Sequence, residues 1–282
     1  MLTALINPVL DLGTAVMGQA KIALMADGLQ DSAARFSDRA DDYVKYRPHY
    51  SAEVVRALVK ACGLRPEHLV ADVGCGPGLL AKVFLDNGNR VTGVEPNPEM
   101  RAAGEQYLVG YPGFSMLAGS AEATSLPAAS VDFVVAGQAF HWFQPRETRS
   151  EFVRVLTPNG WVVLVWHDRD TQSNVFLREY DLFIRRYAVD YEQVTHKYVA
   201  SYDALQQFFA PDPMQVIHQH SRQRFDFDGL RGRLLSSSYI PKSGPRYEAM
   251  EQALPQFFAQ QAKDGHVVLD YDTKIYFGHL TA

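Results

Sequence analysis

Residues 70–78, VADVGCGPG, constrain the fold more than any other part of this 282-residue chain. The run VADV is short and apolar apart from its acid, which is typical of a buried strand. Gly74, Gly76 and Gly78 follow it, and helix-forming residues begin at Leu79. Glycine permits positive φ angles and lets a ligand approach the backbone closely. The segment therefore predicts a strand, a glycine turn open to a ligand, and a helix.

After this turn, short β-branched runs alternate with helical patterns, which indicates βαβ units and a largely parallel sheet. We therefore predict an α/β, doubly wound fold. Strands are expected at residues 69–73, 90–94, 114–118, 131–136, 161–166, 219–227 and 266–280. Helices are expected at 54–62, 79–87, 98–109, 148–156, 228–237 and 246–263, with a turn at 157–160.

Two regions outside this alternation are predicted to be helical. Apolar residues recur every three or four positions over residues 9–24, which predicts an amphipathic helix that packs on the domain, packs on a second subunit, or forms a lid. Residues 1–50 are expected to form a helical cap or lid, ended by Pro48. Residues 51–282 are expected to form the main domain, with a helical insertion at about 173–210.

Composition excludes several classes of function. No stretch approaches the roughly 20 apolar residues that span a bilayer. The net charge of -5, from 27 basic and 32 acidic residues, argues against binding a nucleic-acid backbone. The only cysteines, Cys62 and Cys75, form neither a disulfide framework nor a zinc site, and they favour a cytoplasmic location. His, Asp and Glu show no metal-ligand spacing.

One acid after the glycine turn points to an adenosine ligand, and another before it argues against a dehydrogenase. Glu95 ends the second predicted strand, where a carboxylate can accept both ribose hydroxyls. NAD-dependent oxidoreductases place an acid there too, so Glu95 alone leaves that class open. Asp72 stands two residues before Gly74, where dehydrogenases usually have an apolar residue. Gly78 also falls one position early for the third glycine of the dinucleotide pattern.

Both details make the turn resemble the first motif of class I S-adenosylmethionine-dependent methyltransferases. QAFHWF at 138–143 and YDTKIYFGHL at 271–280 resemble small-molecule methyltransferases related to trans-aconitate methyltransferase. This resemblance runs from about residue 36 to the C-terminus. It implies a Rossmann-like, mostly parallel seven-stranded sheet with an antiparallel last strand, S-adenosylmethionine as cofactor and a small-molecule acceptor. The region 137–138 lacks the acid of metal-dependent catechol methyltransferases and the Asn-Pro-Pro-Tyr signature of amino-methylating nucleic-acid enzymes.

The resemblance also assigns cofactor-binding residues. Asp72 would orient the amino end of the cofactor, Pro96 would lie under the adenine, and Ala121 and Glu122 would lie beside it. Glu122 could equally be a surface-loop carboxylate. The expected cofactor-binding residues are Asp72, Gly74, Cys75, Gly76, Glu95, Pro96, Met100, Ala121, Glu122, Gln138 and Arg47.

Catalysis depends on the acceptor. Methyl transfer from a sulfonium is an in-line displacement that alignment and desolvation accelerate, so a carboxylate acceptor needs no base. A hydroxyl, amine or carbon acceptor would be helped by His141 or His167, since histidine titrates near neutrality. His141 could instead serve packing. DDYVKYRPHY at 41–50 resembles the family's N-terminal segment that closes over the cofactor, which implies Tyr43 near the sulfonium. Tyr43 could instead be a packing residue of the lid.

Residues for the acceptor are expected around two segments. Trp142 and Phe143 follow the fourth strand, and Tyr239 follows a late helix whose arginines Arg231 and Arg233 could bind an acidic acceptor. Ser236, Ser237 and Ser238 could line the same pocket.

Three other interpretations stay open at this point. The same fold can carry non-methyl chemistry on the sulfonium, such as intramolecular cyclisation. The chain could also be an NAD-dependent oxidoreductase or a non-catalytic binding module. A homodimer through the helix at residues 9–24 is a further expectation.

Overall fold

The structure is a computed structural model that describes residues 40–171, 173–192 and 202–281. The helix predicted at residues 9–24, and with it the homodimer contact, lies outside the described residues. Of the helical cap predicted over residues 1–50, the structure describes α2 (Ala40–Tyr46) and the extended segment that follows it.

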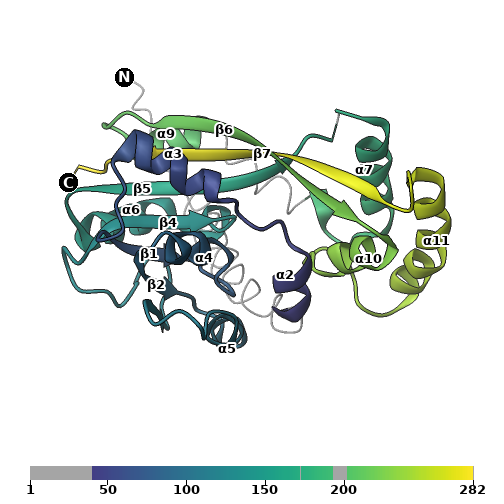
Figure 1. Cartoon of the computed structure of the whole chain (residues 1–282), viewed down its shortest axis with the longest axis horizontal. Helices are drawn as coiled ribbons and strands as arrows, with labels where there is room; N and C mark the ends of the chain where they lie inside the picture. The colour runs from purple at the N-terminus through teal and green to yellow at the C-terminus, as the bar shows by residue number, and fades with distance from the viewer. Residues whose placement is uncertain (1–39, 172, 193–201, 282) are drawn as a thin grey trace, which may run out of the picture.

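A seven-stranded sheet in the order β3-β2-β1-β4-β5-β7-β6 forms the centre of the molecule (Figure 1). β1 pairs in parallel with β2 and β4, whereas β7 is antiparallel to both β5 and β6. The mostly parallel sheet with an antiparallel last strand is thus confirmed. The strands are β1 Leu69–Val73, β2 Arg90–Val94, β3 Phe114–Leu117, β4 Val131–Gly137, β5 Leu156–Arg169, β6 Gln215–Phe225 and β7 Val267–Gly278.

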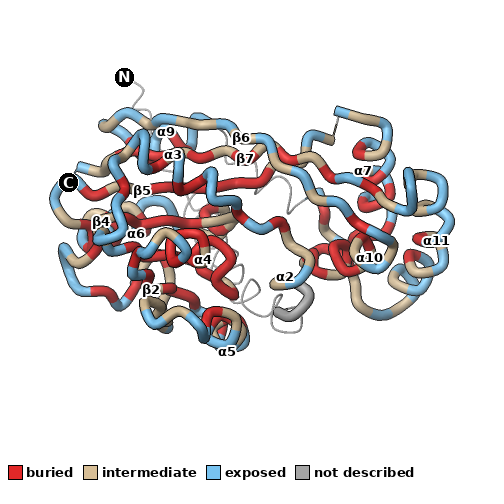
Figure 2. Tube along the Cα trace, viewed as in Figure 1, coloured by how far each residue is buried: buried red, intermediate tan, exposed pale blue. Residues whose placement is uncertain are grey.

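Successive strand residues bury their side chains in two different cores, as the pleat of a strand requires. In β4, Phe133 and Val135 face a core shared with α3 (Ala52–Cys62) and α4 (Leu79–Asp86). Val134 and Ala136 face the opposite core, which α6 (Pro145–Val155) and α9 (Tyr202–Phe209) complete. The central strands β1, β4 and β5 are buried along most of their length (Figure 2). The doubly wound arrangement is therefore confirmed.

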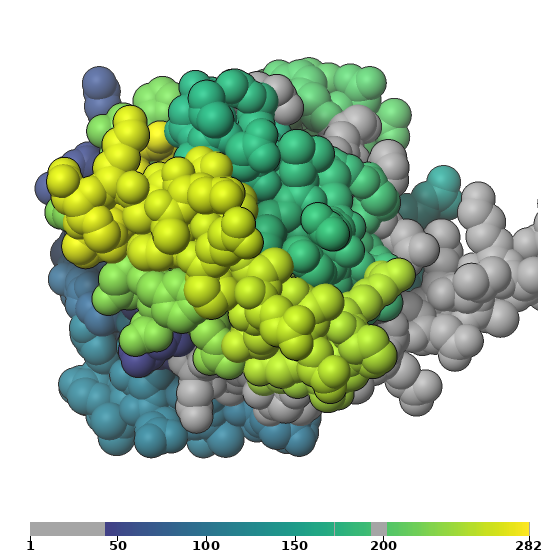
Figure 3. Space-filling view, turned by 90° about the vertical axis from the view of Figure 1, so that its right-hand side faces the viewer, coloured from purple at the N-terminus to yellow at the C-terminus, as the bar shows by residue number. Residues whose placement is uncertain are grey.

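A third core lies beyond the sheet. It joins α7 (Val175–Tyr187), α10 (Phe227–Leu235) and α11 (Pro245–Gln261) to the first residues of β7. These helices and the protruding ends of β6 and β7 form a helical lobe at one end of the molecule (Figure 1), where α7 and α11 lie side by side (Figure 3). α2 packs against α10 and also contacts α5 (Pro98–Tyr107), so it links this lobe to the sheet domain.

The insertion predicted at about 173–210 is helical where described, but its two helices serve different cores. α7 belongs to the lobe, whereas α9 packs on the sheet beside α6. Sequence periodicity shows that both helices are amphipathic but not which apolar surface each one covers. No helix among the described residues is long and apolar enough to cross a membrane.

Strand and helix ends differ from the predictions by a few residues. β6 begins at Gln215 rather than 219, because this edge strand alternates half-buried and exposed residues and lacks an apolar run. β5 begins at Leu156 and includes the turn predicted at 157–160, where Asn159 has a φ of 65°.

Candidate active site

The glycine turn after β1 has the backbone that its sequence predicts. Gly74, Gly76 and Gly78 have φ angles of 68°, 54° and 88°, in the left-handed region that favours glycine. A Cβ on Gly74 would lie 2.6 Å from the Cβ of Ala139, so this glycine permits a close approach of chains. A Cβ on Gly76 would meet no atom within 4 Å. Gly76 therefore leaves open space that a ligand can use.

Glu95 joins the glycine turn to the end of β2. Its Oε2 accepts a hydrogen bond of 2.9 Å from the Gly76 amide, and its Oε1 accepts one of 2.9 Å from the Asn97 amide. Burial raises the pKa of this carboxyl, although both amides act to lower it. Each oxygen keeps a second lone pair, so the carboxylate can still accept hydrogen bonds from a ligand.

Asp72 lies beneath the turn and is only 1% exposed. Burial raises its pKa to about 7, and the Cys75 thiol and the Ala81 amide offset this only in part. Neither carboxylate oxygen has a well-formed hydrogen bond among the described residues. A buried carboxylate of this kind favours a cationic group nearby, which fits the amino end of the expected cofactor.

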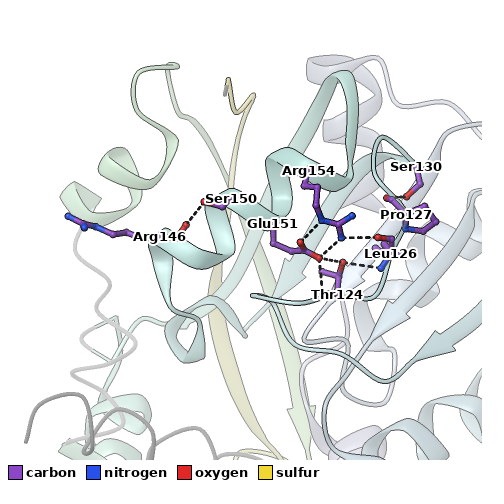
Figure 4. Close-up of polar contacts among 8 residues, drawn as sticks. All are labelled: Thr124, Leu126, Pro127, Ser130, Arg146, Ser150, Glu151 and Arg154. Atoms are coloured by element: carbon purple, nitrogen blue, oxygen red, sulfur yellow. Dashed lines mark hydrogen bonds and ion pairs between the residues drawn. The ribbon is translucent and has the colours of Figure 1, made fainter. Parts of the chain in front are cut away.

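The loop between β3 and β4 carries Ala121 and Glu122, and α6 holds it in place (Figure 4). Glu151 Oε1 accepts hydrogen bonds from the amide and the hydroxyl of Thr124, at 2.8 and 2.6 Å. Arg154 pairs with Glu151 at 2.7 Å and donates to the carbonyl of Leu126. Hydrogen bonds from Arg154 lower the pKa of Glu151 to about 2, so this carboxylate stays charged.

These segments enclose a concave site, which we call the cofactor pocket. Its walls follow the carboxyl ends of β1, β2 and β4, where ligands bind in open parallel sheets. Predicted site residues that line it are Tyr43, Gly74, Gly76, Glu95, Pro96, Met100, Ala121, Glu122, Gln138, Trp142 and Phe143. The open space at Gly76, the carboxylate of Glu95 and the cradle between them fit an adenosine-containing ligand.

A second, larger cleft lies between the sheet and the helical lobe, with a volume of about 1270 Å³. We call it the acceptor cleft. It is lined by residues that include Arg47, Gln138, His167, Arg169, Arg233, Tyr239 and Tyr271.

Gln138 lines both the cofactor pocket and the acceptor cleft. Its φ of 55° is unusual for a residue other than glycine. The backbone is held there by a hydrogen bond of 2.9 Å from the Gln138 amide to the carbonyl of Val165. Its Nε2 donates to the carbonyl of His167, whereas its Oε1 is buried and accepts no hydrogen bond from the described residues. Strained backbone and an unused polar atom are typical of functional sites.

His167 faces the acceptor cleft and is 7% exposed. Its Nδ1 lies 2.8 Å from the hydroxyl of Thr273, and its ring stacks on Tyr50 with 4.5 Å between centroids. Burial lowers its pKa to about 4, and the charge of Arg233 adds to this effect. The ring is therefore neutral near pH 7. Its Nε2 is buried without a partner among the described residues and can accept a proton or a hydrogen bond.

Several predicted residues lie elsewhere than expected. Trp142 and Phe143, expected at the acceptor, line the cofactor pocket. Arg47, expected at the cofactor, lines the acceptor cleft and stacks on Tyr43 at 4.8 Å. His141 lines neither site and packs beside Trp142, so its predicted catalytic role gains no support from its position.

The two arginines of α10 lie in different surroundings. Arg233 and Tyr239 line the acceptor cleft, whereas Arg231 lies outside it and pairs with Glu251 at 2.7 Å. The acceptor role predicted for Arg231 therefore gains no support either. Arg169, which the sequence analysis did not single out, joins Arg233 in the cleft. Arg169 lies at the carboxyl end of β5, and ligands bind at this end of the strands in open parallel sheets, so its position in the sequence could have identified it.

Comparison with known proteins agrees with this geometry. Residues 71–164 match the family model of a methyltransferase domain. An uncharacterized methyltransferase of Mycobacterium tuberculosis is 36% identical over 145 residues, which cover 50% of this chain and 55% of that protein. One of Schizosaccharomyces pombe is 32% identical over 130 residues, which cover 46% and 51%. The chain spans about half the length of these curated relatives.

Solved structures share the fold. A candidate type II methyltransferase from Anaeromyxobacter dehalogenans has a TM-score of 0.61 and 22% identity, covering 84% of this chain and 100% of that one. A candidate methyltransferase of an antibiotic biosynthesis pathway from Anabaena variabilis has a TM-score of 0.54 and 19% identity, covering 84% and 99%. The domain match, the relatives and the fold together support a Rossmann-like, S-adenosylmethionine-dependent methyltransferase domain.

Proposed function

We propose that this protein transfers a methyl group from S-adenosylmethionine to a small-molecule acceptor bound in the acceptor cleft. The main support for the proposal is that Gln138 lines both the cofactor pocket and the acceptor cleft. A methyl group crosses from donor to acceptor over a very short distance, so the two binding sites must meet. They meet at this side chain.

The residues of the chain serve binding and alignment. S-adenosylmethionine, when bound, supplies an electrophilic methyl group on a positively charged sulfur. Glu95 and the backbone of Gly76 would hold the adenosine portion, and Asp72 would favour the cationic amino end. Gln138 would position the methyl donor in the cofactor pocket relative to the nucleophile in the acceptor cleft. Ligands that fill both sites would displace water from them, which strengthens these interactions.

His167 provides a proton acceptor where the acceptor needs one. His167 lines the cleft with a neutral ring, and its buried Nε2 has no partner among the described residues, so it could take a proton from a hydroxyl or amine nucleophile that reaches it. A carboxylate nucleophile would use His167 only as a wall. Tyr43 stays a proposed contact near the sulfonium, supported by its place in the cofactor pocket.

Finer features belong to the same proposal. The stretches at 138–143 and 271–280 favour the small-molecule methyltransferases related to trans-aconitate methyltransferase. The net charge of -5 argues against a nucleic-acid substrate, and two free cysteines favour the cytoplasm. The division into a cap over residues 1–50 and a domain over 51–282, and the homodimer through residues 9–24, also remain proposals.

Calorimetric titration with S-adenosylmethionine tests the proposal. We expect binding that weakens by about 10- to 100-fold in Glu95→Gln, because that change removes the charge from a buried ligand-facing carboxylate. Glu99→Gln, an exposed carboxyl change on α5, serves as the control and should leave affinity unchanged. Absence of binding at millimolar cofactor would contradict the proposal.

Two other functions have distinct signatures. An NAD-dependent oxidoreductase would be stabilised against heat by NADH rather than by S-adenosylhomocysteine. Non-methyl chemistry on the sulfonium would release methylthioadenosine. Incubation of labelled cofactor with a metabolite extract, followed by mass analysis of the products, distinguishes it from methyl transfer, which releases S-adenosylhomocysteine.

A further inference from the structure

We infer that Arg169 and Arg233 form an anion-binding site in the acceptor cleft, which holds an acidic group of the methyl acceptor. The inference rests on the proposed function for the identity of the ligand as an acceptor. The acidic group that the arginines would bind need not carry the atom of the acceptor that is methylated.

The two arginines come from different elements and meet around one set of tyrosines. Arg233 lies on α10, is 4% exposed, and donates from Nη1 to Ser237 Oγ at 3.0 Å. Arg169 ends β5 opposite Tyr271 of β7, and its Nη2 donates to the hydroxyl of Tyr191 at 3.0 Å. The Nε of Arg233 lies 3.4 Å from the hydroxyl of the same Tyr271. The two guanidinium groups are close enough for their like charges to repel.

Among the described residues, neither Arg169 nor Arg233 has an acid within ion-pair distance. The Tyr191 hydroxyl that accepts from Arg169 donates in turn to Asp181 Oδ1 at 2.6 Å, so this tyrosine links Arg169 to a carboxylate without direct contact. Three of the five acids that line the cleft pair with other cations, as Asp168 pairs with Lys274 at 2.8 Å, Asp270 with Arg222 at 2.6 Å and Asp181 with Arg185 at 2.6 Å. The other two, Asp170 and Asp272, form no ion pair with Arg169 or Arg233. Within the described part of the chain, both arginines are therefore without a carboxylate in direct contact.

The positive charge of the two arginines lowers the pKa values of neighbouring side chains. Burial acts to raise the pKa of the Tyr239 phenol, yet Arg169, Arg233 and Arg47 outweigh it and lower that pKa. The charge of Arg233 also adds to the lowering of the His167 pKa. Both groups line the cleft, so the potential acts where the acceptor would lie.

Aromatic stacking does not replace a counter-charge here. Arg169 lies over the ring of Tyr180 at 5.3 Å, which is a favourable but small contribution compared with the cost of desolvating a guanidinium. Arginine cannot lose its charge at physiological pH and presents five N–H donors in a planar fork. Carboxylates and phosphates match that fork, and a bound acid would supply the missing negative charge.

Calorimetric titration of the protein with succinate, inorganic phosphate and uncharged succinamide tests the site. The titrations are run at constant ionic strength, because salt screens charges, both with and without S-adenosylhomocysteine. We expect succinate or phosphate to bind and succinamide not to bind. The tighter of the two anions identifies carboxylate or phosphate as the recognised group.

Matched variants assign the binding to the two arginines. Arg169→Met and Arg233→Met should each raise the dissociation constant of the anion by about 10- to 100-fold. Arg231→Met, on the same helix as Arg233 but outside the cleft, should change it by less than about twofold. Circular dichroism and titration with S-adenosylhomocysteine check that each variant is folded. If a methionine variant is unfolded, Arg169→Lys or Arg233→Lys replaces it, with an expected loss of about three- to tenfold because the fork is lost.

Two outcomes would overturn the inference. One is that both anions bind no more tightly than succinamide. The other is that Arg231→Met weakens anion binding as much as the two cleft variants do. A protein that binds S-adenosylhomocysteine but shows either outcome keeps its proposed function and loses only this site. Failure to bind S-adenosylhomocysteine contradicts the proposed function instead, and the titrations without it still decide the anion site.

Discussion

At the scale of single residues, backbone conformation decides which positions of the site tolerate a side chain. Gly76 and Gly63 both have left-handed backbone, with φ angles of 54° and 63°, and a Cβ on either one would meet no atom within 4 Å. The difference is location. Gly63 ends α3 away from the site, whereas Gly76 lines the cofactor pocket.

Gly76→Ala is therefore predicted to separate stability from binding. Both Gly76→Ala and Gly63→Ala should lower the free energy of unfolding by about 1 to 2 kcal/mol, because alanine disfavours left-handed backbone. Only Gly76→Ala should weaken S-adenosylhomocysteine binding, by at least about tenfold, because its methyl group occupies ligand space. Urea unfolding and calorimetry measure the two effects. Equal affinities in both variants would show that Gly76 does not approach the ligand.

His167 links the site to the pH dependence of stability. Its pKa is lowered to about 4 in the folded protein, from an ordinary value of 6.5. Below pH 6.5 the His167 side chain is protonated in the unfolded chain, whereas in the folded protein it stays neutral down to about pH 4. The free energy of unfolding should therefore fall by roughly 3 kcal/mol from this residue as pH drops through that window.

Urea unfolding between pH 7 and pH 4 checks this expectation. His167→Gln should show a shallower loss of stability on acidification than the unchanged protein. His49→Gln, at an exposed position, should retain the steep loss. Identical pH dependence in the unchanged protein and in His167→Gln would argue against a neutral, buried His167.

At the scale of elements, the site depends on contacts that fix loops to helices. The loop carrying Ala121 and Glu122 has little regular structure of its own and is held by Glu151 and Arg154 of α6 (Figure 4). Glu122 in turn accepts a hydrogen bond of 2.8 Å from the Gln144 amide at the start of α6. The same loop and helix therefore both support the cofactor pocket.

Glu151→Gln is expected to lower the free energy of unfolding by about 1 to 3 kcal/mol at pH 7, because it weakens buried, charge-assisted hydrogen bonds. The matched control is Glu53→Gln, in the exposed i,i+3 pair of Glu53 with Arg56, which should leave the free energy of unfolding almost unchanged.

The pKa of Glu151 is lowered to about 2 from 4.5, so its contribution should disappear as pH falls through that range. Urea unfolding at pH 7 and at low pH measures both effects. A Glu53→Gln variant as unstable as Glu151→Gln would remove the distinction between the half-buried pair of Glu151 with Arg154 and the exposed pair of Glu53 with Arg56.

At the scale of the whole molecule, α2 couples the helical lobe to the cofactor pocket. Tyr43 of α2 lines that pocket, and Tyr46 of the same helix packs against Gly232 of α10. A Cβ on Gly232 would overlap the Tyr46 ring. The short helix α2 therefore contacts both the helical lobe and the cofactor pocket.

Gly232→Ala tests this coupling from a distance. Alanine ordinarily stabilises a helix interior by about 1 kcal/mol relative to glycine. Here it should displace Tyr46 and weaken S-adenosylhomocysteine binding by about three- to tenfold, although Gly232 does not line the cofactor pocket. Addition of Tyr46→Ala should restore part of the affinity. Gly110→Ala, where the added Cβ meets no atom within 4 Å, is the control. Unchanged affinity in Gly232→Ala would mean that α2 does not transmit the displacement.

The sheet and the residues around the cofactor pocket could be predicted from local patterns in the amino-acid sequence. β1 and β2 have the predicted bounds, and the glycine turn, Glu95 and the loop with Ala121 gather in one pocket. These features follow from short-range rules, since strand patterns and glycine turns are local and parallel strands bring their carboxyl ends to one edge.

The composition of the acceptor cleft depends on long-range packing, which local sequence patterns do not predict. Arg169 and Arg233 are separated by more than sixty residues and meet because β5 pairs with β7 and α10 packs beside β7. Arg231 and Arg233 are equivalent in sequence, but the orientation of α10 sends one toward Glu251 and the other into the cleft. Periodicity fixes which residues share a helix face, whereas the partner of that face is set by long-range packing.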